Sequence, residues 1–313
     1  MAFHGKYVAN IDYIEEGTYG STPSNPALVW PGRVYSVRPL NKVKNVVKRY
    51  LPPASVTDNK ALSLTAFKVG EEIGLDIGMV PQTGSLLAWL IYWLGGTTAA
   101  PVSDTQKSVS MVLTDPAAAT NKYHTYAGMT GSELTLDAQE DREIDIKCKM
   151  LGAELTVGNT DPKGSGSHPS ASAGAELTFE DISAAQLKYT ASGSYANLTD
   201  ALHGLTFSIK NKLVLVKDIN NTKSTKIQAI VVAARELGLT LDIDYTDIGT
   251  GSATNFGITD IRSLTDFSFK FTLDSKTYTF TGVKFPELPY EFGPDDIFGD
   301  KLTSLPITSL SIA

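Results

Sequence analysis

The sequence alternates apolar and polar residues along most of its length, and this period of two limits the chain to folds built from β-strands. In the stretch VGEEIGLDIGMV, Leu75, Ile77 and Met79 alternate with Asp76 and Gly78. Successive side chains of a strand point to opposite faces of a sheet, so the pattern predicts a strand with one buried face. The alternation recurs in the stretches REIDIKCKML, LTFSIKNKLVLVKD, ELGLTLDIDYTD and DFSFKFTLDSKTYTFTGVKF.

The segment GSLLAWLIYWLGG departs from this alternation because it is apolar on every side. A Ser stands at the position of a helix N-cap, and Gly residues follow the last apolar residue. We therefore expect a short buried helix. After it we expect three further strands, in the stretches SVSMVLTD, KYHTYAGM and SELTLDAQ.

The overall charge argues against a protein that grips nucleic acid. The chain has 313 residues and a net charge of −7, whereas phosphate binding depends on Lys and Arg. Its only cysteine, Cys148, cannot form an intramolecular disulfide, which is typical of folding in a reducing cytoplasm. The start MAFHGKYVANIDYIEEG lacks the pattern of a signal peptide. The run LLAWLIYWL is too short to span a membrane, so we expect a soluble chain without membrane binding.

Three stretches of the first half have counterparts in the second half in the same order. EIGLDI and ELGLTL begin at Glu72 and Glu236, which are 164 residues apart. Val109–Thr114 (VSMVLT) and Phe267–Thr272 (FSFKFT) are separated by 158 residues. The stretches YHTYAGM and TYTFTGV are separated by 154 residues, and both run on to Glu-Leu. The changing offset is what insertions in loops would produce, so we interpret the matches as an internal duplication.

A Gly- and Ser-rich stretch near the middle of the chain separates the two halves. Residues 158–175 have no apolar period, which is typical of a linker or a mobile loop. The predicted organisation follows from this boundary. It comprises an N-terminal arm at 1–35, a first β domain at 36–157, the linker at 158–175, a second β domain at 176–285 and a proline-rich C-terminal arm at 286–313.

Several stretches share a pattern of strand order and glycine placement: EEGTYGSTPS leading into RVYSVRPL, then VGEEIGLDIGM, then YHTYAGMTGSELTLDAQEDREIDIKCKMLGAEL, and finally GVKFPEL and DKLTSLPITSLSI. This pattern, which covers most of the chain, resembles the tail tube (major tail) proteins of long-tailed bacterial and archaeal viruses. The resemblance implies tandem β-sandwich or half-barrel domains, each with at most one short helix, plus extended N- and C-terminal arms.

The resemblance also implies a function and a set of partners. Rings of such subunits stack into a tube that encloses a tape-measure protein and later conducts DNA without binding it specifically. Tail terminator and tail-tip proteins are further partners, the virion tail is the location, and no cofactor is implied. The apparent duplication favours three chains per ring, in imitation of sixfold symmetry, although six chains stay possible.

For a channel that passes DNA, an acidic or neutral wall is favourable because it does not hold phosphates. The strand patterns place Asp76, Asp242 and Asp244 on polar faces, so we take these residues as candidates that line the lumen. The alternative is that they solvate an outer face of the protein.

A basic stretch near residue 40 is the candidate for contacts between rings. The stretch RVYSVRPLNKVKNVVKRYLPP predicts an exposed hairpin or long loop that could meet the acidic PDDIFGD of the next ring. The residues concerned are Arg38, Lys42, Lys44, Lys48, Arg49, Asp295 and Asp296. A solvated loop is the alternative.

The sequence contains no motif that predicts an enzyme. It lacks the nucleophile elbow, the zinc-protease helix and the P-loop. Its four histidines are not at ligand spacing, so we expect no catalytic residue and no metal site. An alternative function of a different class is that of a β-sandwich module for carbohydrate binding or adhesion. The strands and the Tyr and Trp content would also fit such a module.

Overall fold

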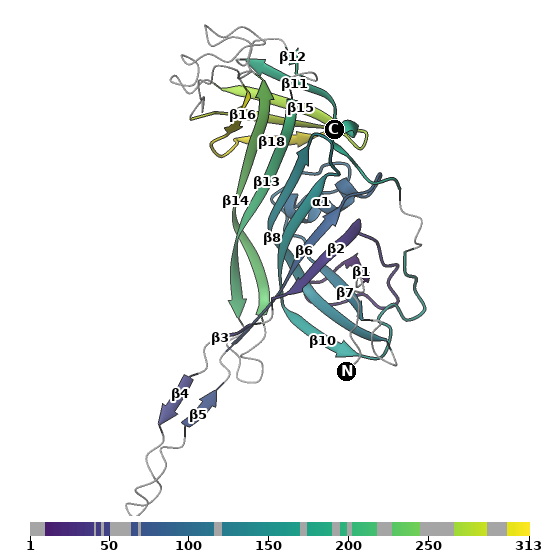
Figure 1. Cartoon of the computed structure of the whole chain (residues 1–313). Coiled ribbons are helices and arrows are strands. Elements are labelled where there is room, and N and C mark those ends of the chain that lie inside the picture. The colour runs from purple at the N-terminus through teal and green to yellow at the C-terminus, as the bar shows by residue number, and fades with distance from the viewer. Residues whose placement is uncertain are drawn as a thin grey trace, which may run out of the picture.

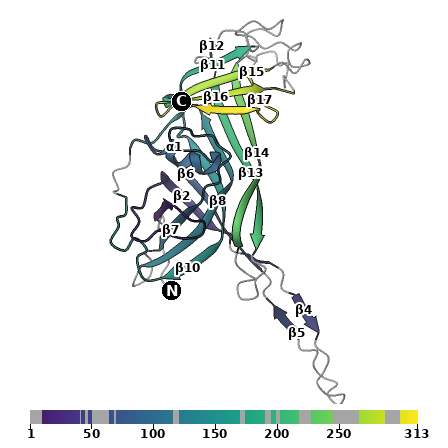
Figure 2. The same cartoon turned by 180° about the vertical axis from the view of Figure 1, so that it is seen from behind.

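The protein is built almost entirely from antiparallel β-structure, as the alternation of the sequence predicts. The computed structural model describes residues 10–40, 42–44, 47–50, 64–67, 70–115, 121–169, 174–189, 195–198, 202–217, 227–244, 266–286 and 299–313. These form an 11-stranded sheet, a 5-stranded sheet and a separate two-stranded hairpin. Figures 1 and 2 show the small sheet at one end of the elongated large sheet and the hairpin projecting beyond the other end.

The elements divide between the two halves of the chain. The first half contains β1 (Asn10–Glu15), β2 (Arg33–Pro39), β3 (Lys42–Lys44), β4 (Val47–Tyr50), β5 (Leu64–Phe67), β6 (Gly70–Val80), α1 (Leu86–Leu94), β7 (Val109–Asp115), β8 (Lys122–Gln139), β9 (Asp145–Gly152) and β10 (Glu154–Gly158). The second half contains a 3₁₀ turn (Phe179–Asp181), β11 (Ser183–Tyr189), β12 (Tyr195–Asn197), β13 (Leu202–Lys217), β14 (Ile227–Asp244), β15 (Phe267–Leu273), β16 (Lys276–Val283), β17 (Gly299–Thr303) and β18 (Ser309–Ile312).

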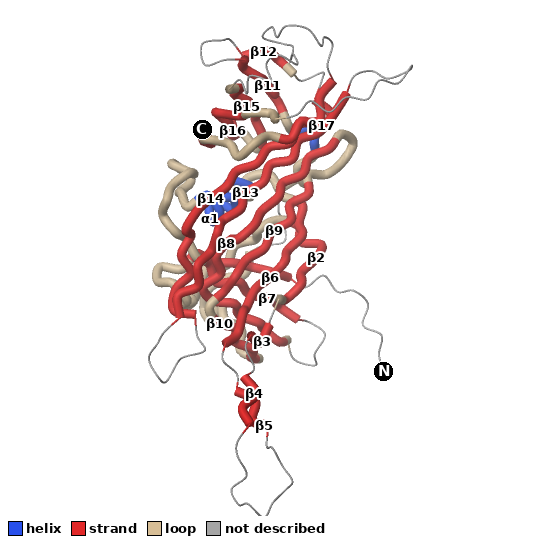
Figure 3. The backbone as a smooth tube through the Cα atoms, turned by 90° about the vertical axis from the view of Figure 1, so that its left-hand side faces the viewer, coloured by secondary structure: helices blue, strands red, loops and turns tan. Residues whose placement is uncertain are grey.

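Both halves contribute to the large sheet. Its main path runs in the order β17-β14-β13-β8-β9-β6-β2, so three strands of the second half continue four strands of the first. The two groups meet where β13 pairs antiparallel with β8, from Gly204 opposite Gln139 to Lys210 opposite Glu133. Figure 3 shows these strands side by side, with α1 behind them.

The same antiparallel strand pairings occur in both halves. The pairs β1–β7, β2–β6, β6–β9, β7–β8 and β8–β10 have the counterparts β11–β15, β13–β14, β14–β17, β15–β16 and β16–β18. The three sequence matches fall on counterpart strands, namely β6 and β14, β7 and β15, and β8 and β16. The topology therefore repeats along the chain, while the predicted domain boundaries stay predictions.

Irregularities of the pairing also recur at matched positions. The register of β2–β6 shifts between Val34 and Ser36, and that of β13–β14 shifts between Leu202 and Gly204, with 168 residues separating each matched pair. A second shift lies beside Gly128 in β8 and beside Gly282 in β16. These glycines have φ values of 69° and 68°, a left-handed conformation that glycine adopts without steric cost.

The sequence predicts two strands where the structure has one. KYHTYAGM and SELTLDAQ together form the 18-residue strand β8. Before the bend at Gly128 this strand pairs with β7 and β10, and beyond it with β9 and β13. The positive φ of Gly128 redirects the chain without ending the strand, so one strand serves two parts of the sheet.

The helix covers the apolar face of the large sheet. The expected helix is confirmed at Leu86–Leu94, and Gly95 ends it in the left-handed conformation. Trp89 and Trp93 are fully buried, and their ring centroids lie 4.9 Å apart. The predicted core residues Leu75, Ile77 and Met79 are confirmed as buried. The apolar residues that alternate in REIDIKCKML and ELGLTLDIDYTD are buried as well: Ile144, Ile146, Cys148, Leu239, Leu241 and Ile243.

A hydrogen-bonded clasp ties the end of this helix to the second half of the chain. The Arg235 Nη1 donates to the carbonyls of Leu94 and Ser103 at 2.9 and 3.0 Å, and its Nε donates to Asn211 Oδ1 at 3.0 Å. The buried Asn211 in turn donates to the carbonyls of Trp93 and Gly131. Carbonyls at a helix end have no partner within the helix, so β13 and β14 satisfy groups of the first half.

The predicted arms and linker are partly tied to the rest of the chain. Strand β1 of the N-terminal arm pairs with β7, and β17 and β18 of the C-terminal arm pair with β14 and β16. In the linker, Ser167 forms a parallel bridge with Ala27, and its carbonyl accepts a hydrogen bond from the Leu28 N–H. The composition of the arms and the linker predicted that they lack a regular apolar pattern. It did not predict the strands with which they pair.

Candidate functional site

The face of the large sheet opposite α1 is polar, and we call it the polar face. Its charged residues come from β2, β6, β8, β9, β13, β14 and β17, where they alternate with the buried residues of the core. They include Asp76, Glu133, Asp137, Asp145, Glu236 and Asp242 among the carboxylates, and Arg38, Lys147, Lys149, Lys210 and Lys301 among the cations. The formal charges of this set nearly cancel.

Six of these residues form a row in which the sign of the charge alternates from strand to strand. The strand registers place Lys210 of β13 between Glu236 of β14 and Glu133 of β8. They continue the row through Lys149 of β9 and Asp76 of β6 to Arg38 of β2. We call Glu236, Lys210, Glu133, Lys149, Asp76 and Arg38 the charge row. It crosses the junction between the two halves without a break in the alternation.

Contacts within the charge row show cross-strand pairing. The Lys149 Nζ lies 3.0 Å from Glu133 Oε2, and Arg38 Nη2 lies 3.4 Å from Asp76 Oδ2. Directly opposite side chains on neighbouring strands are about 5 Å apart at Cβ, so opposite charges there stabilise a register and like charges oppose it. The hydrogen bond to Glu133 raises the pKa of the Lys149 ammonium group.

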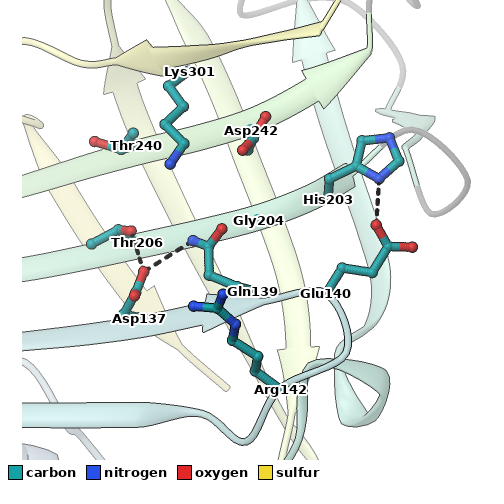
Figure 4. A pocket seen from close by; sticks show the side chains of 10 residues that line it. All are labelled: Asp137, Gln139, Glu140, Arg142, His203, Gly204, Thr206, Thr240, Asp242 and Lys301. Carbon is teal, nitrogen blue, oxygen red and sulfur yellow. Dashed lines mark hydrogen bonds and ion pairs between the residues drawn. The ribbon is translucent and has the colours of Figure 1, made fainter.

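The polar face is hollowed near the junction of β8, β13, β14 and β17 (Figure 4). The depression has a volume of about 370 Å³ and is lined mainly by polar and charged side chains. Asp137 accepts hydrogen bonds from Thr206 Oγ1 at 2.7 Å and from Gln139 Nε2 at 3.0 Å. At its rim, His203 Nδ1 lies 2.8 Å from Glu140 Oε2. These side chains already use one another as partners, which suits a smooth polar wall better than a ligand pocket.

The structure brings two of the candidate lumen residues to this one face. Asp76 lies on β6 beside Arg38, and Asp242 lies on β14 opposite Lys301 of β17. Asp244 occupies the last position of β14, in register with Gly299. Asp76 and Asp242 therefore lie on a face of mixed charge, whereas sequence reasoning treated the three carboxylates as a separate acidic set.

The candidate contact residues between rings are spread over several elements. Arg38 is on β2 and belongs to the charge row. Lys42 and Lys44 lie on β3, while Lys48 and Arg49 lie on β4 of the projecting hairpin (Figure 1). Asp295 and Asp296 lie outside the described residues. The hairpin is placed at the end of the large sheet where β2 leads into β6.

Sequence reasoning missed Lys210, Glu236, Glu133 and Lys149 as members of one site. Each is an ordinary charged residue on an alternating strand, and only the register between strands aligns them. The duplication contained a partial signal, because Glu72 and Glu236 occupy matched positions and their strand partners are Lys42 and Lys210.

A second polar cluster fixes the linker to strand β1. His168 Nδ1 lies 2.7 Å from Oδ2 of the buried Asp12, and its Nε2 lies 3.0 Å from Asp161 Oδ2. Lys163 Nζ also contacts Asp161 at 3.2 Å. Burial lowers the pKa of His168, but the hydrogen bonds and charges of Asp12 and Asp161 outweigh it and raise that pKa above its ordinary value. The imidazolium form can donate to both carboxylates at once.

The residues that the structure describes bear on two further features, a group of metal-binding side chains and a helix long enough to span a membrane. In these ranges no three His, Cys, Asp or Glu side chains form a group able to hold a metal ion. The helices in the same ranges are too short or too polar to cross a bilayer.

Comparison with known families yields one match that covers nearly the whole chain. A model of the phage tail tube protein family matches residues 8–308. Comparison with curated protein sequences finds no match. The family match favours the resemblance over the carbohydrate-binding or adhesion module.

Reversing the central charge of the row tests its role at the junction of the halves. Lys210→Glu places three carboxylates in succession, and we expect it to lower the free energy of unfolding by about 1–2 kcal/mol. Lys210→Met keeps the apolar stem and should cost less. Urea titration measures both variants, and 1 M salt should shrink their difference because it screens exposed charges. Equal stability of the two variants at low salt would contradict the pairing.

Titration of His168 predicts a pH dependence of stability. Because its folded-state pKa is raised, its contribution is fully present below the unfolded value of about 6.5 and is lost as the pH rises through the folded value. In the wild type, the free energy of unfolding should therefore fall as the pH rises from about 6.5 through the folded-state pKa of His168. Urea titrations at a series of pH values should show the step much reduced in His168→Gln. A step of the same size in the variant would rule out His168 as its source.

Proposed function

The chain belongs to the phage tail tube protein family and is a structural subunit of a viral tail tube, and we propose that three copies close each ring of that tube. Stacked rings would enclose a tape-measure protein during assembly and conduct DNA during ejection. Synthesis in the host cytoplasm and contacts with tail terminator and tail-tip proteins are part of the same proposal.

The repeated strand topology within one continuous sheet is the observation that supports a ring of three chains. Each half of the chain supplies the same set of strand pairings, and β8 and β13 join the halves side by side. Two joined halves can therefore occupy two neighbouring positions of a ring. A head-to-tail contact between chains would then close three copies into a ring that imitates sixfold symmetry.

We propose that the polar face lines the lumen, with Asp76, Asp242 and Asp244 among its residues. A wall rich in unpaired cations would gain affinity for DNA with each phosphate contact. In the charge row, by contrast, each Lys or Arg stands opposite a carboxylate. Such a wall suits a channel that first holds a protein and then passes DNA without specific binding.

Contacts between rings are assigned to the projecting hairpin and its basic residues. The hairpin β4–β5 extends from the end of the large sheet at which β2 leads into β6 (Figures 1 and 3). We propose that Arg38, Lys42, Lys44, Lys48 and Arg49 face an acidic surface of the next ring that includes Asp295 and Asp296. Opposite charge on the two surfaces would guide the stacking of rings.

Electron microscopy and mass measurement on the purified protein test the ring. We expect hollow rings with six lobes and the mass of three chains, three times 33.6 kDa or about 101 kDa. Rings of six chains would support the role as a tube subunit but contradict the proposal of three chains per ring. Compact monomers at every concentration would overturn both and would favour the binding module.

A charge reversal on the polar face tests its place in the lumen. Asp242→Lys adds a cation beside the Lys301 position, and we expect virions with this tube to release DNA more slowly because phosphates gain a contact. Asp242→Asn removes the charge without adding a cation and serves as the control. Release rates of purified virions, compared at low and high salt, provide the measurement. Unchanged release in virions that contain the Lys variant would place Asp242 outside the channel.

A further inference from the structure

We propose that the outer face of the small sheet is a binding site for an acidic polysaccharide. The small sheet is the five-stranded sheet β12-β11-β15-β16-β18, and its outer face is the side that does not contribute to the core. Lys188 and Lys270 are the cations of this site. The site itself does not depend on the proposed ring, whereas its place on the outside of the tube follows from the proposed lumen.

The outer face is turned away from the polar face of the large sheet. Phe269, Phe271 and Phe280 lie on the other side of the small sheet and are buried. The ring centroid of Phe280 is 5.2 Å from that of Phe207 on β13, so the apolar sides of the two sheets face each other across the core. If the polar face borders the lumen, the outer face lies on the exterior of the tube.

The outer face combines two cations with hydroxyl and amide groups. Ser and Thr side chains of β15, β16 and β18 alternate there with buried residues, and Gln186 and Asn197 add amides. Among the outward residues of the five strands, as far as the structure describes them, there is no carboxylate. This face is therefore positively charged, although the whole chain has a net charge of −7. In the charge row, by contrast, each cation stands opposite a carboxylate.

The two lysines converge on one aromatic ring. Lys270 Nζ lies 4.2 Å and Lys188 Nζ 5.7 Å from the centroid of the Tyr195 ring. Lys188 stands opposite Tyr195 and Ser268. Lys270 is two residues from Ser268 on β15 and stands opposite Gln186. Like charges so placed repel each other, and an anionic group between them would relieve this repulsion and accept hydrogen bonds from both ammonium groups.

The matched face of the first half is closed by the chain itself. Strands β1 and β7 are the counterparts of β11 and β15, and Asp12 and Val112 on them are 2% and 0% exposed. His168 of the linker lies over this face, with its Nδ1 2.7 Å from Asp12 Oδ2. The first half therefore has no free surface at the place where the second half has its outer face.

The residues at matched positions differ in charge between the two halves. Where the first half has two apolar residues and a carboxylate, the second half has two cations and an amide. The sequence match of VSMVLT with FSFKFT and the registers of β1–β7 and β11–β15 relate Val112 to Lys270, Asp12 to Gln186, and Ile14 to Lys188. The copy of the face that is not closed by the linker is thus the copy that favours anions.

The chemistry of the outer face favours a polysaccharide over other anions. Ser, Thr, Asn and Gln side chains both donate and accept hydrogen bonds, as the hydroxyl groups of sugars do, whereas the backbone of duplex DNA presents phosphate acceptors. A folded acidic protein would need an apolar or aromatic centre for stable contact, but Lys270 covers the ring of Tyr195. A polymer with repeated acidic groups can bind many copies of the site along a tube, so weak contacts add up.

Binding of two polysaccharides tests the inference, with alginate as the acidic probe and dextran as the neutral one. The purified chain is coupled to a sensor surface through an N-terminal biotin, so the measurement does not require rings. We expect alginate to bind and dextran not to bind, and alginate binding should weaken as the salt concentration approaches about 0.5 M, because salt screens exposed charges. Equal binding of dextran, or alginate binding that salt leaves unchanged, would overturn the inference. Duplex DNA that binds as tightly as alginate would show a general site for polyanions and overturn the assignment to a polysaccharide.

Variants of the chain locate the site. K188Q/K270Q should lower the affinity for alginate about tenfold. K212Q/K276Q is the matched control: it removes the same charge from β13 and from a position of β16 that does not lie on the outer face, and it should bind as the wild type does. Y195L keeps both lysines and should lose about two- to fivefold in affinity, because the ring no longer holds them together.

Wild-type affinity in K188Q/K270Q, or an equal loss in the control, would contradict the proposed site and leave the ring of three chains unaffected. Wild-type protein that binds alginate but forms no rings would support the site and overturn the proposed ring.

Discussion

The antiparallel pairing of β8 with β13 is the interaction on which the rest of the structure depends. It turns two sets of strands into one sheet, aligns their apolar sides over a single core and their charged sides on a single face. A slip by one residue would send every side chain of one half to the wrong face. The hydrogen bonds of Asn211 and Arg235 to the carbonyls of Trp93 and Leu94, at the end of α1, oppose such a slip because it would move these donors away from the carbonyls.

Two joined halves expose fewer unpaired strand edges than two separate half sheets would. A half sheet alone would expose strands at both sides, and exposed edges invite uncontrolled association. Joining two halves covalently satisfies one edge of each within the chain, through β8 and β13. The recurrence of the bends at Gly128 and Gly282 shows that the geometry of the strands, as well as their order, is repeated.

The fold class and the alternation of each strand were accessible from the sequence because side-chain period is a local property. Leu75, Ile77 and Met79 are buried as predicted, and the helix lies where expected. Pairing is not local, so neither the continuity of β8 through Gly128 nor the strand edges that take up β1, β17 and β18 could be predicted. The candidate site shows the same division: Asp76 and Asp242 were found as polar residues, but the cations opposite them required the register.

We propose that this polar face, with its charges paired across strands, is the inner wall of the tube. A cryo-electron microscopy reconstruction of assembled tubes tests it most directly. We expect Lys210, Lys149 and Asp242 to border the lumen while α1 lies on the outer side of the sheet, in a ring of three chains. A lumen bordered by α1 or by the small sheet, with the polar face turned to the exterior, would contradict it.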